Sequence, residues 1–284
     1  MSDTPHAHSP HLRIWHDGDL LTDPDQRRIS AVDHGLVVGD GVFEAFKVTP
    51  AGPFTVRRHL ERLTRSARLM GLPDPDHHQI REAIAVVIEG RTYELGRLRI
   101  TWTGGVGPLG SGAAFGSPTL VVAVDAVQPA PPVSQIVTTP WLRNVRGAMT
   151  GVKTTSYGEN VRGLAYAAER GGSEGIFVNT DGNLAEGTGT NVFCVFGGQI
   201  VTPPLTAGIL DGITRQLVLE WNDVAERDLT LAEAQTADEV FITSSMRDVQ
   251  AVDQWDAVSF SAPGPLTAEV QQRFAERSTA DINP

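Results

Sequence analysis

The sequence predicts an α+β protein built on antiparallel or mixed sheets. Across its 284 residues, segments that alternate apolar and polar residues, as strands do, are mixed with segments whose apolar residues recur three and four apart, as in helices. The two kinds of segment do not alternate regularly and no internal repeat occurs, so a doubly wound parallel sheet is disfavoured. The length suits one large domain or two smaller ones, and we expect two lobes.

The first half of the chain predicts a small N-terminal domain over residues 12–127, after a disordered tail at 1–11. The tail contains histidines, but in a polar terminus with proline and serine they do not predict a metal site. The expected elements are a hairpin at 12–22 that turns at Asp17–Gly18, a strand in the second half of 31–49, helices at 57–71 and 76–90, and strands at 96–103 and 118–127.

The second half predicts a larger domain over residues 134–284. A Pro-rich segment at 128–133 is typical of a linker between the two lobes. The expected elements are a strand at 134–141, a meander of strands at 175–204, a helix at 211–221, a buried strand at 238–245 and a terminal helix at 265–277.

Charge and cysteine content narrow the possible functions. The chain has 34 acidic and 23 basic residues, a net charge of −11, which argues against a nucleic-acid partner because phosphate contacts need clustered lysine and arginine. No basic segment leads into an apolar one at the start, and no run of about 18 apolar residues occurs, so we expect neither secretion nor membrane insertion. The single cysteine, Cys194, lies in the apolar run NVFCVF, which predicts a buried thiol and a reducing, cytoplasmic location.

Lys153 is one of only two lysines in the chain, the other being Lys47. Three interpretations are open. Lys153 is structural or extends its ammonium to solvent; its ammonium is desolvated among small residues, so that the neutral amine can form a Schiff base; or it serves as the base for a serine nucleophile such as Ser156. The third has no accompanying nucleophile-elbow motif.

A Schiff-base lysine that works with pyridoxal phosphate needs an anion site for the phosphate and an acid beside the ring nitrogen. Backbone amides of Ile213 and Thr214, in the first turn of a predicted helix, offer the anion site, and Arg62 offers a bidentate cation. Glu186 is a lone carboxylate among small residues that a pyridinium would compensate. Each feature also has an ordinary explanation: Arg62 on a solvated helix face, residues 211–212 as a helix cap, and Glu186 as a loop carboxylate. The prediction therefore depends on their joint occurrence.

With these residues in place, the chain resembles the class IV, fold-type IV pyridoxal-phosphate enzymes over residues 12–253. This family includes D-amino-acid and branched-chain aminotransferases, (R)-amine transaminases and 4-amino-4-deoxychorismate lyases. The motifs that carry the resemblance, in family order, are GDGVFE at 39–44, HLERL at 59–63, KTTSY at 153–157, LAEGTGTNVF at 184–193, TPPLTAGILDGITR at 202–215 and DEVFITSS at 238–245. The resemblance implies a small N-terminal α/β lobe, a larger C-terminal lobe and a homodimer.

The resemblance also implies a role for each matching residue. Lys153 matches the lysine that forms the Schiff base and carries the substrate proton, and Glu186 matches the partner of the pyridine nitrogen. The other matches are Tyr157 near the phenolic oxygen, Arg62 with the Ile213 and Thr214 amides at the phosphate, Leu210 on the ring face, and Ser245 as an added hydroxyl.

The substrate is less well defined by the motifs. GDGVFEAFKV is similar to the D-amino-acid aminotransferase and lyase patterns, and we expect a pocket lined by Val38, Phe43, Lys47 and Ser244. The loop TGGVGPLGSG lacks the arginine with which those enzymes hold the substrate carboxylate. Candidates for that role are Lys47, Arg143 and backbone amides near Ser244 and Ser245.

We therefore expect a transaminase that moves an amino group from a small-molecule donor, a D-amino acid or (R)-amine, to a 2-oxo acid acceptor. The alternatives within the family are 4-amino-4-deoxychorismate lyase, which forms 4-aminobenzoate and pyruvate, and branched-chain aminotransferase. An alternative of another class is a cofactor-free binding protein on this fold, in which Lys153 is purely structural.

Overall fold

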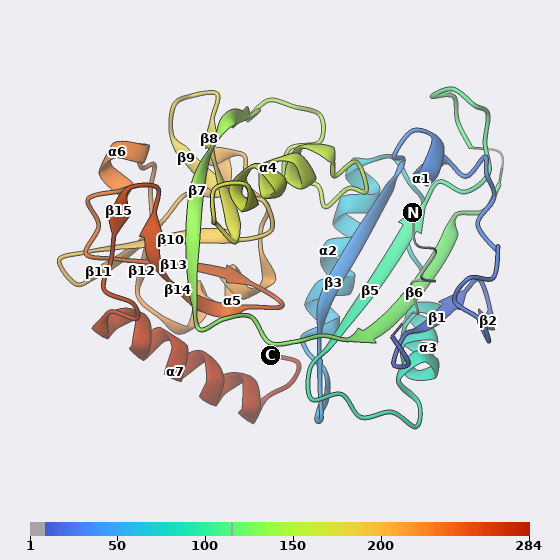
Figure 1. Ribbon diagram of the computed structural model, residues 1–284. Coiled ribbons are helices and arrows are strands. Elements are labelled where there is room, and N and C mark those ends of the chain that lie inside the picture. Colours follow the sequence, from blue (N-terminus) through green and yellow to red (C-terminus); the bar gives the residue numbers. More distant parts are fainter. Residues whose placement is uncertain (1–8, 115) are drawn as a thin grey trace, which may run out of the picture. The chain divides into compact units, whose positions relative to one another are not determined.

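The computed structural model describes residues 9–114 and 116–284, and these divide into two compact units. The first unit comprises the described residues up to 128, with 153–156 and Asn283; the second comprises 129–152, 157–282 and Pro284 (Figure 1). Each unit is described by itself. Most of the predicted tail, residues 1–8, lies outside the described residues.

The first unit contains a six-stranded sheet in the order β2-β1-β6-β5-β3-β4, with every neighbouring pair antiparallel. The predicted hairpin at 12–22 is present, since β1 and β2 pair across the turn at Asp17–Gly18. The strands are β1 (Arg13–His16), β2 (Asp19–Leu20), β3 (Gly41–Thr49), β4 (Gly52–Pro53), β5 (Gly96–Thr103) and β6 (Thr119–Ala126).

Helices of the first unit pack on this sheet, α2 against β3 and α3 against β6 and β1 (Figure 1). The predicted apolar face of α2 is buried, with Leu60, Leu63 and Ala67 fully enclosed, and each buried leucine contributes about 1.5–3 kcal/mol. Asp76 caps α3 by accepting the backbone N–H groups of His78 and Gln79. The helices are α1 (His34–Val37), α2 (Val56–Leu69) and α3 (His77–Ile88).

Residues 153–156 belong to the first unit because they pair with the start of β3. Thr154 forms an isolated antiparallel bridge with Val42, and the N–H of Phe43 donates to the Lys153 carbonyl at 3.0 Å. The N–H of Thr155 donates to the Gly41 carbonyl at 2.8 Å. A segment distant in sequence is thus fixed to β3 by main-chain hydrogen bonds.

The second unit contains a nine-stranded mixed sheet. Its main path runs β12-β11-β10-β13-β14-β7-β8-β9, with β15 paired to β14. The β11–β12, β14–β7 and β7–β8 pairs are parallel and the others are antiparallel. The strands are β7 (Val133–Arg143), β8 (Glu174–Asn179), β9 (Leu184–Gly187), β10 (Asn191–Phe196), β11 (Gln199–Thr202), β12 (Val224–Glu226), β13 (Glu239–Ser244), β14 (Asp248–Trp255) and β15 (Val258–Ser259).

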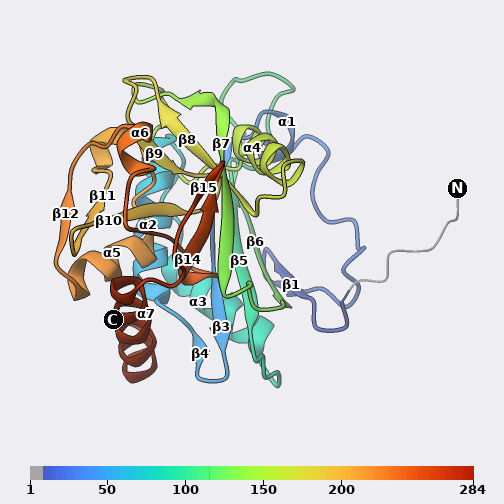
Figure 2. The same cartoon turned by 60° about the vertical axis from the view of Figure 1, so that its left-hand side comes forward.

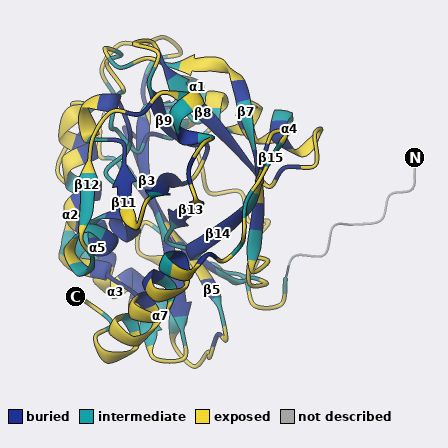
Figure 3. Ribbon diagram, turned by 90° about the vertical axis from the view of Figure 1, so that its left-hand side faces the viewer, coloured by how far each residue is buried: buried dark blue, intermediate teal, exposed yellow. Residues whose placement is uncertain are grey.

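The second unit has its own apolar core, which includes Val240, Ile242 and Trp255 from β13 and β14. Helix α7 covers β13, β14 and α5, burying Val270 and Phe274 and exposing its outer face (Figures 2 and 3). The helices are α4 (Gly158–Ala168), the 3-10 helix η1 (Leu205–Ala207), α5 (Ile213–Trp221), α6 (Leu231–Ala234) and α7 (Pro265–Ala280).

The α+β class with antiparallel and mixed sheets is confirmed, but two substantial elements were not expected from sequence. Helix α4 contains Gly158 and Gly163, residues that weaken a helix prediction. A Cβ at Gly163 would lie 2.8 Å from Thr188 and 3.0 Å from Phe177, so close packing explains the glycine. Strand β14 follows Asp248 in the left-handed region, φ 52°, and buries the polar Gln250. Within the described residues, no helix has the length and apolar character needed to cross a membrane.

Candidate functional site

Lys153 is half-buried in the first unit, and its main chain is fixed on both sides. Its N–H donates to Ser66 Oγ at 3.3 Å, while its carbonyl accepts from Phe43. The ammonium nitrogen lies 4.5 Å from the centroid of the Phe43 ring, within cation–π range. Two residues predicted from sequence, Lys153 and Phe43, are therefore in contact.

Arg62 lies in a buried ionic cluster one helical turn before Ser66. Its Nε and Nη2 donate to the two carboxylate oxygens of Glu44 at 2.8 and 2.6 Å, and His59 Nδ1 lies 2.6 Å from Glu44 Oε2. Burial raises the pKa of Glu44, but the charges and hydrogen bonds of Arg62 and His59 outweigh it and leave that pKa at about 2. Burial lowers the pKa of His59, so its imidazole is neutral at pH 7. Glu44 thus fixes the orientation of the arginine that the motif predicts at the phosphate.

A second cation contacts the Phe43 ring. The guanidinium carbon of Arg99, on β5, lies 3.9 Å from the ring centroid. The cationic groups of Arg99 and Lys153 are therefore close to each other, because both contact the same ring. Lys47, four residues along β3, is buried, with its ammonium 4.7 Å from the Phe54 ring. Val38 follows helix α1 and is 40% exposed.

In the second unit, Glu186 on β9 is held between a backbone amide and an arginine. Glu186 Oε2 accepts the N–H of Leu210 at 2.9 Å, and Oε1 lies 3.4 Å from Arg143 Nε. The Arg143 guanidinium also stacks on Phe177, 4.2 Å from the ring centroid. Two predicted residues, Glu186 and Leu210, are brought together, and Arg143 lies beside the carboxylate.

The segment 210–214 forms the entry to α5. Asn191 Nδ2 donates to the Leu210 carbonyl at 3.0 Å, and a Cβ at Gly212 would overlap Asn191 Oδ1. No side chain caps α5, so the amides of Ile213 and Thr214 form a helix N-terminus of the kind that binds phosphate. Asn191 pairs in register with Thr243, whose hydroxyl is buried without a hydrogen-bond partner among the described residues.

Ser244 and Ser245 follow Thr243 at the end of β13. The Ser244 hydroxyl accepts the backbone N–H of Arg247 at 3.2 Å, so it belongs to the tight turn between β13 and β14.

Tyr157 precedes α4, and its hydroxyl donates to the Thr188 carbonyl at 3.0 Å. Burial, together with the charges of Glu186 and Glu174, raises the pKa of Tyr157 from 10.0 to about 12. The phenol is therefore a hydrogen-bond donor throughout the neutral range. A phenolate or carbonyl oxygen of a ligand is the partner it suits.

These features fit pyridoxal phosphate. Taken by itself, the unit that contains Lys153 has an amine and an arginine fixed by Glu44. The second unit, taken by itself, has a carboxylate, a phenol and a helix N-terminus. Arg143 Nη2 and the Thr190 and Thr243 hydroxyls are also buried without a hydrogen-bond partner among the described residues, and this donor set suits an anionic heterocycle.

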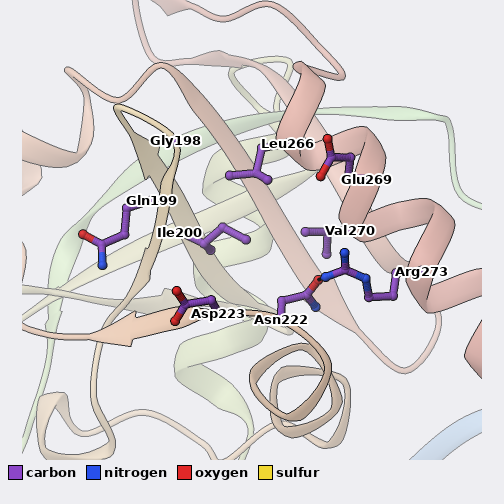
Figure 4. Close-up of a pocket in the computed structure, with 9 residues that line it drawn as sticks. All are labelled: Gly198, Gln199, Ile200, Asn222, Asp223, Leu266, Glu269, Val270 and Arg273. Atoms are coloured by element: carbon purple, nitrogen blue, oxygen red, sulfur yellow. Dashed lines mark hydrogen bonds between the residues drawn. The ribbon is translucent and has the colours of Figure 1, made fainter.

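The second unit also has a surface cavity of about 320 Å³ at the end of α7 that contains none of the predicted residues (Figure 4). Arg273 there donates to Asn222 Oδ1 at 2.7 Å. Its lining is Gly198, Gln199, Ile200, Asn222, Asp223, Leu266, Glu269, Val270 and Arg273. Most of these residues are exposed, and Arg273 is paired with Asn222, so we assign this cavity no chemistry.

Several residues of the site were not found from sequence. Glu44 had a usable signal, because it alternates with Val42 and Phe46 on the apolar side of β3, where an ionised group requires a partner. Arg99 lies in an alternating strand and is indistinguishable in sequence from a solvent-facing arginine. Asn191 lies inside the quoted motif LAEGTGTNVF, but its role depends on a contact with residue 210.

Comparison with known proteins is consistent with this arrangement. The amino-transferase class IV family model matches residues 41–255. A bifunctional aminodeoxychorismate lyase / D-amino acid transaminase of Mycobacterium tuberculosis is 32% identical, over 81% of this chain and 86% of its own.

Two solved structures share the fold. The branched-chain amino acid aminotransferase of Escherichia coli has a TM-score of 0.86 at 26% identity, covering 93% of both chains. The PLP-bound form of a hypothetical aminotransferase from Mycobacterium tuberculosis has a TM-score of 0.82 at 29% identity, covering 95% of this chain and 99% of its own. The latter protein was also solved with α-ketoglutarate and PMP.

Proposed function

The chain belongs to the amino-transferase class IV family, and from that premise we propose that it is a transaminase acting on D-amino acids or (R)-amines. The cofactor is pyridoxal 5′-phosphate, as in the family. The amino group passes to a 2-oxo acid. The α-ketoglutarate form of the Mycobacterium tuberculosis structure supports the acceptor class.

When bound, pyridoxal phosphate supplies a carbonyl that joins the substrate amine and a ring that takes up the electrons left by a departing proton. Lys153 Nζ accepts that proton from the amine-bearing carbon as general base and later donates it. Glu186 would hold a proton at the pyridine nitrogen, and Tyr157 would lie near the phenolic oxygen while its hydroxyl donates to the Thr188 carbonyl. Arg62 and the Ile213 and Thr214 amides bind the phosphate. Lys153 and Tyr157 are four residues apart, so the covalent chain keeps their Cα atoms within about 14 Å.

The observation that supports an amino-acid substrate is that two cationic side chains, Lys153 and Arg99, contact the Phe43 ring. The ammonium of Lys153 and the guanidinium of Arg99 lie 4.5 and 3.9 Å from one ring centroid. An amino acid that bound through its nitrogen would carry its carboxylate two bonds away, and a guanidinium is a bidentate partner for a carboxylate. We infer that Arg99 supplies the charge that the loop TGGVGPLGSG lacks.

The lyase reaction is the alternative that a specific observation favours. The Mycobacterium tuberculosis relative is described as bifunctional, an aminodeoxychorismate lyase and a D-amino acid transaminase. The pattern GDGVFEAFKV is similar to both groups. In both reactions Lys153 removes the proton. The lyase reaction then releases pyruvate, whereas transamination does not.

The test is to mix the yellow holoenzyme with D- and L-amino acids, (R)-amines and aminodeoxychorismate. We expect D-amino acids or (R)-amines to convert the visible cofactor band to the pyridoxamine form, and a 2-oxo acid to restore it. Pyruvate from aminodeoxychorismate without conversion by any amino acid would refute the transaminase and support the lyase. Conversion by L-amino acids alone would support the branched-chain alternative.

The role of Arg99 has its own test. R99Q removes a charge-assisted hydrogen bond worth about 1.5–3 kcal/mol, so kcat/KM for D-amino acids is expected to fall by roughly tenfold to a hundredfold. For (R)-amines without a carboxylate, kcat/KM is expected to stay within about twofold. R97Q is the matched control, because Arg97 is an exposed cation two residues before Arg99 on the same face of β5 but pairs in register with Lys47. Equal losses for both substrate classes in R99Q would contradict this role.

The homodimer that the resemblance implies is also part of this proposal. Helix α4 exposes Val161 and Leu164, 64% and 43% accessible, which supports an apolar contact with another chain. Sedimentation of the holoenzyme tests it. A single species at the mass of one chain at micromolar concentration would refute the dimer.

A further inference from the structure

Arg247, in the turn between β13 and β14, reaches across to the start of β8. Its Nη2 donates to the Ser173 carbonyl at 2.9 Å and lies 3.3 Å from Glu174 Oε2, while Nη1 donates to Gln250 Oε1 at 2.9 Å. The Glu174 side chain is 3% exposed and that of Arg247 is 21% exposed. The proposed reaction assigns no role to this ion pair.

The other oxygen of Glu174 holds the turn at 188–189. Glu174 Oε1 accepts the Gly189 N–H at 3.0 Å and a short hydrogen bond from the Thr188 hydroxyl. The Thr188 N–H donates to the Gly175 carbonyl at 2.9 Å. Each carboxyl oxygen of Glu174 therefore has its own partners, and this buried side chain fixes the turn.

The carbonyl of Thr188 is the acceptor for Tyr157. The Tyr157 hydroxyl donates to it at 3.0 Å and Asn160 Nδ2 donates at 2.5 Å. A continuous series of contacts thus leads from Arg247 through Glu174 and Thr188 to the phenol. The groups facing Glu174 are the Arg247 guanidinium, the Thr188 hydroxyl, the Gly189 amide and, beyond the turn, the Tyr157 phenol.

We propose that Arg247 is a positioning residue for Tyr157: it keeps Glu174 a carboxylate, Glu174 fixes the 188–189 turn, and the turn orients the phenol. The significance of this orientation rests on the proposed function, in which Tyr157 lies near the phenolic oxygen of the cofactor. Burial raises the pKa of Glu174 above its ordinary value, and the Arg247 charge is the largest effect that opposes the rise. Without Arg247 the buried carboxyl takes up a proton, which leaves the turn a weaker neutral acceptor, or moves toward water, which removes the acceptor.

The first test is hydrogen exchange in the cofactor-free protein. R247Q and E174Q are each expected to speed exchange of the 187–191 segment by about tenfold, because a neutral oxygen is a weaker acceptor than a carboxylate oxygen. R247K is expected to restore part of the protection. R162Q is the control, because Arg162 lies 3.3 Å from Glu169 in an ion pair whose side chains are 53% and 57% exposed. Unchanged exchange at 187–191 in R247Q would overturn the proposal.

The second test distinguishes positioning of Tyr157 from simple stabilisation. In the holoenzyme, R247Q is expected to shift the pH midpoint of the visible band, and Y157F is expected to shift it too. In the Y157F background R247Q is expected to add nothing, because its effect passes through the phenol. Equal shifts in both backgrounds would overturn the proposal. If the wild-type protein forms no visible band with added pyridoxal phosphate, the proposed function fails, and the exchange measurement alone decides whether Arg247 holds the turn.

Discussion

Arg143 Nε lies 3.4 Å from Glu186 Oε1, and the same arginine reaches Glu159 with Nη1 at 3.2 Å. The two carboxylates differ in burial, since the Glu186 side chain is 11% exposed and that of Glu159 is 72% exposed. An exposed ion pair contributes little, whereas a charge in an enclosed site acts through a low dielectric. Arg143 thus contacts two carboxylates: the buried Glu186, which we propose acts on the cofactor, and the exposed Glu159. A substitution at Glu159 can therefore serve as the control for one at Glu186.

E186Q is expected to slow the half-reaction with amino acids by about a hundredfold, because the amide cannot keep the pyridine nitrogen protonated. The Leu210 N–H retains an oxygen acceptor, so the fold is preserved. E159Q is expected to leave the rate within about twofold. Stopped-flow absorbance of the cofactor band measures both variants. A similar loss in E159Q, or none in E186Q, would contradict the assignment of Glu186.

Because of the ionised Glu44, we expect the free energy of unfolding to fall at acid pH. Its folded pKa of about 2 lies below the ordinary value of 4.5, so its contribution is fully present above pH 4.5 and is lost as pH falls toward 2. The shift corresponds to about 3 kcal/mol. His59 acts in the same direction, because its lowered pKa leaves the folded imidazole neutral while the unfolded one takes up a proton below pH 6.5.

Urea unfolding of the wild type and of E44Q between about pH 3 and 7 checks this expectation. E44Q is expected to be destabilised by about 3–5 kcal/mol near pH 7, because it leaves Arg62 buried without its carboxylate, and to lose most of the pH dependence below 4.5. If the free energies of unfolding of the two proteins changed in parallel with pH across this range, Glu44 would not be responsible for the loss of stability at acid pH.

The fold was predicted from sequence to the extent that local patterns determine it. The hairpin at Asp17–Gly18, helix α2 and strand β13 follow from turn chemistry and apolar periodicity. Helix α4 does not, because Gly163 within it is explained only by contacts with Phe177 and Thr188. Residues 153–156 lie between parts of the second unit in sequence, and only hydrogen bonds to β3 assign them to the first unit.

The residues of the site likewise divide into those that a local motif predicts and those that only the folded structure brings together. Lys153 and Glu186 stood out because a rare lysine and a lone carboxylate occur in recognisable motifs. The pairing of Glu174 with Arg247 depends on strand order and on a turn 73 residues later, so no local pattern reveals it. The proximity of Arg99 to Lys153 likewise depends on two separate segments meeting at Phe43.

Helix α7 is capped by a residue from another element. Glu239, at the start of β13, accepts the N–H groups of Leu266 and Thr267 at 3.0 and 2.7 Å, where Gly264 offers no side-chain cap. E239Q is expected to lower the free energy of unfolding by about 1–2 kcal/mol, through the loss of a charge at a helix N-terminus.

G264A is expected to be destabilising as well, because its Cβ would overlap the Glu239 carboxyl group. Thermal or urea unfolding measures both variants, and E269Q, on the exposed side of α7, is the control. A destabilisation in E239Q no larger than that in E269Q would refute the capping role.

Cys194 is the only cysteine and is fully buried in β10. Burial raises the pKa of its thiol from 9.0 to about 12, so almost no thiolate is present near pH 8. We expect a disulfide reagent to modify folded protein only at the rate at which the core opens, and to react at once in denaturant. Fast stoichiometric modification of native protein would contradict this burial.

Lys153 and Lys47 are the only lysines in the chain, so covalent trapping distinguishes them without mutagenesis. The protein is incubated with pyridoxal phosphate, reduced with borohydride to convert the C=N bond into a stable amine, digested and analysed by mass spectrometry. We predict the reduced label on the peptide that contains Lys153 and none on the peptide that contains Lys47. Label on Lys47, equal label on both lysines, or no label at all would contradict Lys153 as the residue that binds the cofactor.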